Sequence, residues 1–173
     1  PRDALRYGHE FWMDHASGLL LKANLIGERG EILESFTFTQ VSIGGPLEQG
    51  ALAPRFQGER LRVQQVRTSD LRGDDMGWAF RNMLPGFRKL GMVKRQLAPD
   101  QPESLHAVFS DGLASISVFI EPGGMGGETD VMASMGPVSI YRRQLGEHRL
   151  VVMGEVPPQA VKRLGEGIER RRK

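Results

Sequence analysis

The chain has 173 residues, of which 39% are hydrophobic and 25% are charged, and its formal net charge is +2. These fractions are close to globular averages, so we expect a hydrophobic core rather than a disordered chain. The sequence contains no cysteine, which excludes thiol catalysis, disulfides and cysteine-based zinc sites. The basic excess comes partly from the terminal run at 169–173, so we expect no nucleic-acid partner.

The first 43 residues predict a meander of three antiparallel strands. Residues 7–13 and 19–25 alternate between apolar and polar side chains, and turn-forming residues at 14–18 join them into a hairpin. A third strand falls within 31–43. Three strands leave two unpaired edges, so we interpret the meander as the end of a larger curved sheet and the chain as part of a longer protein.

Glycine and proline interrupt every period between residues 44 and 75, which predicts a linker. Leu61, Val63 and Gln65 alternate with arginine and glutamine, so this linker is expected to carry a short strand. The second domain is expected to follow at 76–173.

The clearest local signal in the second domain is a hairpin at 105–121 around Asp111-Gly112. Asp-Gly favours a two-residue type I′ turn, because both central positions need a positive φ. That turn would pair Phe109 with Ala114 and put the apolar side chains on one face. We therefore expect Phe109 and Ile116 on the same face of a sheet.

A second hairpin is expected at 138–156, turning at Gly146-Glu147, and its apolar residues on both faces predict a central position in the sheet. Pro157-Pro158 then opens a helix whose apolar stripe runs to Ile168 and covers the sheet. Glycines at 165 and 167 weaken the last turn of this helix, which is expected to fray. The predicted fold class is α+β, a two-layer domain of antiparallel sheet and helix preceded by the meander.

No constellation of residues predicts an enzyme. His106 and Ser110 are four residues apart on one extended strand, about 13 Å at 3.3 Å per residue, which is too far for a nucleophile–base pair. The four histidines lack the short spacings that are typical of metal ligands. We therefore expect a binding protein with no cofactor and no metal.

Several short motifs resemble, in order and spacing, the RseB/MucB family of regulatory proteins. The first half contributes Tyr7-Gly8, Trp12, Asp14, Ser17-Gly18-Leu19, Gly30, Leu33-Glu34 and Phe36. The second half contributes Trp78, Leu84-Pro85-Gly86-Phe87, the run from Phe109 to Leu113, Ser117-Val118 and the run from Gly154 to Pro158. Together these motifs span nearly the whole chain.

The resemblance implies a negative regulator of the sigma-E (AlgU-like) envelope stress response, located in the periplasm. Such a protein would bind the periplasmic segment of an RseA/MucA-like anti-sigma factor and protect it from DegS-type proteolysis, with release by lipid or lipopolysaccharide signals. Residues 1–43 would then be the last strands of a LolA-like open barrel, and 76–173 the family's C-terminal domain. A periplasmic lipid or lipoprotein carrier is the alternative.

Two sets of candidate site residues follow. Arginine and tyrosine are enriched at binding hot spots, which favours Tyr141, Arg142 and Arg143 as contacts to the anti-sigma segment, although they fit solvated residues near a turn equally well. The candidate lipid-facing residues form an apolar face on the meander: Phe11, Met13, Leu21, Phe36 and Phe38. Packing against strands outside this chain is the other interpretation of that face. We also expect the chain to form a homo-oligomer through residues 7–43, with packing of this face against the chain's own C-terminal domain as the competing arrangement.

Overall fold

The computed structural model describes residues 1, 3–53, 67–70, 76–96, 102–123 and 130–171. A three-stranded antiparallel sheet contains β1 (Gly8–Met13), β2 (Leu20–Ile26) and β3 (Ile32–Thr37), in that order. A short 3₁₀ helix, η1 (Gln49–Leu52), follows. The predicted meander is therefore confirmed, although its third strand ends at Thr37.

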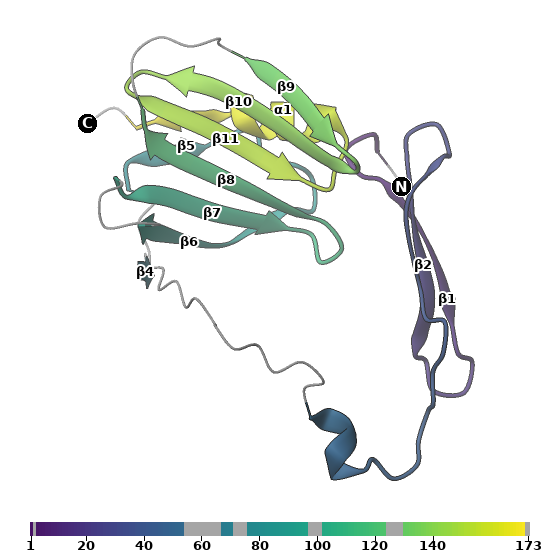
Figure 1. Cartoon of the computed structure of the whole chain (residues 1–173). Coiled ribbons are helices and arrows are strands. Elements are labelled where there is room, and N and C mark those ends of the chain that lie inside the picture. The colour runs from purple at the N-terminus through teal and green to yellow at the C-terminus, as the bar shows by residue number, and fades with distance from the viewer. Residues whose placement is uncertain (2, 54–66, 71–75, 97–101, 124–129, 172–173) are drawn as a thin grey trace.

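The second sheet is antiparallel and has seven strands in the order β4-β6-β7-β8-β11-β10-β9 (Figure 1). Its members are β4 (Arg67–Asp70), β6 (Arg88–Gln96), β7 (Ser104–Ser110), β8 (Ser115–Pro122), β9 (Val131–Met135), β10 (Val138–Leu145) and β11 (His148–Gly154). Strand β4 belongs to this sheet although it falls inside the predicted linker. The alternating run at 61–65 lies outside the described residues.

The second domain also contains helix α1 (Pro158–Glu166) and a small sheet of β5 (Trp78–Phe80) with β12 (Ile168–Arg170). Helix α1 packs on β10 and β11, so the expected mixed α+β arrangement of sheet and helix is present. The core between these layers is fully apolar at its centre, with Ile116, Val118, Val152, Val161 and Ile168 completely buried. Within the described residues, no helix is long and apolar enough to cross a membrane.

The hairpin of β7 and β8 has the predicted faces but not the predicted turn. Phe109 pairs with Ile116, two residues further than expected, so the loop has four residues rather than two. Asp111 explains the longer loop, because its Oδ1 accepts hydrogen bonds from the backbone N–H groups of Leu113 and Ala114. A shift of two residues leaves every side chain on its original face, so Phe109 and Ile116 are both buried in the core.

The second hairpin is confirmed, since Leu145 pairs with His148 across Gly146-Glu147 and β10 and β11 are interior strands. The expected extension of the helix to Ile168 was wrong, because α1 ends at Glu166 and Ile168 pairs with Phe80 in β12. Gly165 does not mark a frayed end. A Cβ at this position would lie 2.4 Å from Cδ1 of Tyr141, so the glycine lets the helix approach the sheet closely.

Candidate binding groove between the two sheets

The segment before β1 attaches the three-stranded sheet to the second domain. Leu5 is buried in the core of that domain. Arg6 follows it, and its guanidinium donates hydrogen bonds to Asp3 at 2.7 Å, to Asp111 at 2.5 Å and to the carbonyl oxygen of Pro85. The same group lies over the ring of Phe87, 4.8 Å from its centroid. These contacts define the Arg6 cluster, which fixes β1 beside the β7–β8 loop.

The Arg6 cluster is an ionic site that is held in its charged form. Burial alone would raise the pKa of Asp111, but hydrogen bonds from the backbone of Ala114 and from Arg6 outweigh it and hold the pKa below its usual range. Burial would likewise lower the pKa of Arg6, but the carboxylates of Asp111 and Asp3 raise it. Both partners therefore stay charged over the whole physiological range.

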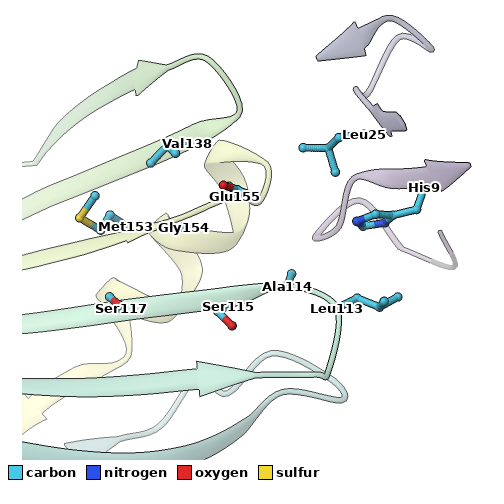
Figure 2. A pocket seen from close by; sticks show the side chains of 10 residues that line it. All are labelled: His9, Leu25, Leu113, Ala114, Ser115, Ser117, Val138, Met153, Gly154 and Glu155. Atoms are coloured by element: carbon cyan, nitrogen blue, oxygen red, sulfur yellow. The ribbon is translucent and has the colours of Figure 1, made fainter. Parts of the chain in front are cut away.

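A groove lies between the three-stranded sheet and the end of the second domain, directly beside this cluster. It consists of three adjoining cavities of about 370, 280 and 160 Å³, all of which are lined by His9 and Glu155. Figure 2 shows the largest of these three cavities, with His9 and Leu25 on one wall and Leu113, Met153 and Val138 on the other. Phe11 and Phe36 line the two smaller cavities. We call this set of cavities the interdomain groove.

The groove combines apolar walls with a small number of polar groups. Leu113 projects from the β7–β8 loop with 71% of its surface exposed, although it is a large apolar residue. Polar groups come from Ser115, Ser117 and the exposed Glu155. A concave, mostly apolar surface with a few polar groups is typical of sites that bind a partner segment or ligand.

Ser117 connects the groove to the face of the large sheet opposite α1. Its hydroxyl lies 3.0 Å from Nε2 of His106, and the imidazole ring stacks on Phe119 with centroids 4.3 Å apart. Burial, with a smaller contribution from Arg95, lowers the pKa of His106, and Nδ1 of this ring has no hydrogen-bond partner within the described structure. These surroundings favour the neutral form of the His106 ring.

The structure does not place the three predicted contact residues on one surface. Tyr141 is buried against α1, and its hydroxyl donates to Asp130 at 3.0 Å, so a direct contact to a partner would require the domain to open. Arg143 donates to the carbonyl oxygens of Glu166 and Ile168 at 3.4 Å each, beside the C-terminal end of α1. Of the three, only Arg142 is exposed. Tyr141 and Arg143 thus help to hold α1 against the sheet, a role that the alternation of side chains along the strand did not indicate.

The predicted lipid-facing residues do form an apolar surface. Phe11, Met13, Phe36 and Phe38 are each 45–63% exposed, and the rings of Phe36 and Phe38 meet edge to face with centroids 5.0 Å apart. Leu21 is partly buried. Whether lipid or a second copy of the chain covers this surface stays a prediction.

Sequence reasoning missed the residues that build the groove: Arg6, Asp111, Leu113 and Glu155. Asp111 stood out as a turn residue, beside the rejected catalytic pair and within a family motif, but not as an ion-pair partner, and nothing local to Arg6 indicated a partner 105 positions away. The serine and histidine considered for catalysis have other partners, since Ser110 donates to the carbonyl oxygen of Ala114 and His106 contacts Ser117. No group of three or more potential metal ligands occurs among the residues that the structure describes.

The chain thus combines a small antiparallel sheet with a larger α+β domain, and the groove lies between them. Family comparison agrees with this division: the MucB/RseB C-terminal domain matches residues 72–169, and the MucB/RseB N-terminal domain matches residues 1–56. The chain therefore belongs to the MucB/RseB family.

Individual relatives carry regulatory names. The sigma factor AlgU regulatory protein MucB of Pseudomonas aeruginosa is 34% identical over 97% of this chain and 53% of its own length. The sigma-E factor regulatory protein RseB of Escherichia coli K12 is 26% identical over 97% of this chain and 52% of its own length. The chain thus spans about half the length of the curated relatives that it matches.

Solved structures of MucB show the same fold. MucB in complex with periplasmic MucA matches with a TM-score of 0.80 and 30% identity, over 100% of this chain and 60% of that chain. The Pseudomonas aeruginosa MucA/MucB complex gives a TM-score of 0.78 at 31% identity, over 100% of this chain and 58% of that chain. A third structure, of MucB, gives a TM-score of 0.63 at 30% identity, over 98% of this chain and 55% of that chain.

Proposed function

We propose that this chain is the C-terminal part of a periplasmic negative regulator of an envelope stress response, and that it binds the periplasmic segment of a MucA/RseA-like anti-sigma factor in the interdomain groove. The observation that carries this proposal is the groove itself. It lies between the parts of the chain that match the two family domains, and both parts contribute apolar side chains to it. A non-catalytic role agrees with the regulatory names of the relatives.

The arrangement of the two sheets adds support. The chain superposes better on the two MucB structures that contain MucA than on the third structure, of MucB, with TM-scores of 0.80 and 0.78 against 0.63. We infer that the Arg6 cluster holds the two sheets in the orientation that is suited to a bound partner. A groove of fixed geometry reduces the entropy that is lost on binding.

Binding in this groove would also protect the anti-sigma factor from proteolysis. A protease needs access to an extended and unshielded backbone, and a segment lying between the two sheets would be covered on both sides. The walls that would cover it come from β1 and β2 on one side and from the β7–β8 loop and β11 on the other.

Release by lipid or lipopolysaccharide has a physical basis in two shared residues. Phe11 and Phe36 belong to the exposed apolar surface of the small sheet, and they also line the smaller cavities of the groove. An acyl chain that covered this surface would therefore compete for side chains that the bound segment needs. Competition at shared residues makes the two ligands mutually exclusive.

A periplasmic lipid or lipoprotein carrier is the second candidate function. The exposure of Phe11, Met13, Phe36 and Phe38 favours it, because monomeric soluble proteins rarely leave a contiguous apolar patch uncovered. A pure carrier, however, has no need of a second domain that contributes a wall to a groove.

Retention of a defined anti-sigma segment separates the two functions. The periplasmic domain of Pseudomonas aeruginosa MucA would be immobilised, and the chain would be passed over it with and without a lipid such as phosphatidylglycerol. A regulator is retained and is released by the lipid. A chain that binds the lipid but is never retained is a carrier, and the proposed function is then wrong.

A further inference from the structure

A second concave site lies on the C-terminal domain and shares no lining residue with the interdomain groove. It has a volume of about 640 Å³. Its lining comes from β5 and the residues after it, the start of β6, the end of β7 and the residue after β12. The lining residues are Ala79, Phe80, Arg81, Met83, Lys89, Phe109 and Arg171. We call it the β5 pocket.

The floor of the β5 pocket is aromatic and apolar. Phe109 is buried in the core, and the ring of Phe80 lies against it with centroids 5.2 Å apart. Phe80 and Met83 pack on the core but remain partly exposed on the pocket side. The floor is therefore a firm apolar surface that stays in contact with water.

The rim of the pocket is cationic. Arg81, Lys89 and Arg171 are all exposed and come from three separate segments of the chain. Glu169 forms an ion pair with Arg81, whose side chain is still 71% exposed, and Lys89 and Arg171 also interact with neighbouring groups. Nζ of Lys89 lies over the ring of Phe80 at 5.7 Å, so positive charge stands directly beside the apolar floor.

We propose that the β5 pocket binds an acidic peptide segment of a protein partner, with one aromatic or leucine side chain on the floor and aspartate or glutamate side chains at the rim. Arginine-rich and aromatic surfaces are typical of hot spots, and complementary charge speeds the encounter of partners. An acidic residue of the partner can share Arg81 with Glu169, because an exposed guanidinium has donors for two carboxylates.

The openness of the floor favours a peptide over a single-chain amphiphile. Small ligands usually bury about 70–90% of their surface in their site, and the apolar part of this pocket's lining is too small to cover an acyl chain to that extent. An anchor side chain on a peptide needs only local cover, because neighbouring residues supply further contacts. Cations that are distributed over three segments also match charges that are spaced along a chain.

Fluorescence anisotropy with short labelled peptides tests the proposal on the full chain. The probe is fluorescein-labelled Asp-Glu-Trp-Leu-Glu-Asp. One control replaces its acidic residues with Asn and Gln, and another replaces Trp-Leu with Gly-Ser. We expect the probe to bind about tenfold more tightly than either control at low ionic strength.

Variants place the binding in the pocket. Lys89→Glu and Arg171→Glu should each weaken probe binding about tenfold, and Lys89→Gln by less, because charge reversal adds repulsion. Arg29→Glu, on a side chain that is 90% exposed in the turn before β3, should have no effect. Circular dichroism checks that each variant is folded. If Lys89→Glu does not fold, Arg171→Glu is the variant that tests the proposal. Equal affinity for acidic and neutral peptides, or rim variants that bind normally, would overturn the proposal. So would saturable binding of dodecanoate that requires Lys89 while the peptide fails to bind.

Discussion

Arg6 and Asp111 are 105 residues apart in the sequence, yet Nε of Arg6 lies 2.5 Å from Oδ2 of Asp111 in a pair whose side chains are only 21% and 11% exposed. Both residues line one cavity of the interdomain groove. It joins the segment before the small sheet to the loop of the β7–β8 hairpin. The ion pair thus sets the position of one groove wall relative to the other.

A double-mutant cycle on Arg6→Ala and Asp111→Ala should give a coupling free energy of about 1–3 kcal/mol, because hydrogen bonds between partly buried charged groups are stronger than neutral ones. Urea unfolding measures it. The pair Arg149–Glu121 is a matched control at 2.7 Å with side chains 56% and 30% exposed, and its coupling should stay below about 1 kcal/mol. Equal coupling in the two pairs would contradict the role assigned to Arg6.

The same pair predicts a dependence on acid. The pKa of Asp111 is lower in the folded state than the usual value of about 3.9, so its contribution to stability is complete above that value. The contribution is lost as the pH falls through the lower folded-state pKa.

Gly165→Ala should destabilise the protein although alanine is the better helix former. Propensity alone would stabilise α1 by about 1 kcal/mol. The new methyl group would lie 2.4 Å from the ring of Tyr141, and overpacking of this kind costs about 1–3 kcal/mol or more. Thermal unfolding measures whether the substitution lowers or raises the stability. An increase in Tm would contradict the prediction and would mean that the ring of Tyr141 moves aside without a loss of stability.

The hairpin at Asp111 and the interdomain groove show which features sequence patterns can predict and which they cannot. Alternation and turn chemistry predicted the strands of both hairpins and the shared face of Phe109 and Ile116, because those features depend on neighbours along the chain. The register at Asp111 was missed, since it depends on how one carboxylate bonds the backbone of its own loop. The groove was missed because its two walls come together through the contact between Arg6 and Asp111. That contact joins distant parts of the chain, so no local sequence pattern indicates it.

His106 should make the protein less stable in mild acid. Its folded-state pKa is lowered, chiefly by burial, so below the unfolded value of about 6.5 the unfolded chain binds a proton that the folded chain resists. The unfolding free energy should therefore fall as the pH decreases from about 7.5 to about 5.5. His106→Phe should flatten this slope. A slope that persists in His106→Phe would assign the acid sensitivity to other groups.

Single substitutions of Arg142 and Arg143 should have different effects on stability. Arg143→Ala removes two hydrogen bonds to carbonyl oxygens beside the end of α1 and should cost about 1 kcal/mol of stability. Arg142→Ala should change stability by less than about 0.5 kcal/mol, because its side chain is exposed. Arg142→Ala is therefore the clean test of a partner contact on this strand. Unchanged affinity for the MucA periplasmic domain would remove Arg142 from the candidates.

The central claim is that the interdomain groove holds the anti-sigma segment, and a matched pair of leucines tests it most directly. Leu113 lines the groove and is 71% exposed, whereas Leu90 is 58% exposed and lines none of its cavities. Isothermal titration calorimetry would measure the affinity of Leu113→Asp and Leu90→Asp for the periplasmic domain of Pseudomonas aeruginosa MucA. The account predicts that Leu113→Asp weakens binding by about tenfold or more while Leu90→Asp binds like the unmodified chain. Unchanged binding by Leu113→Asp, or an equal loss in both variants, would contradict it.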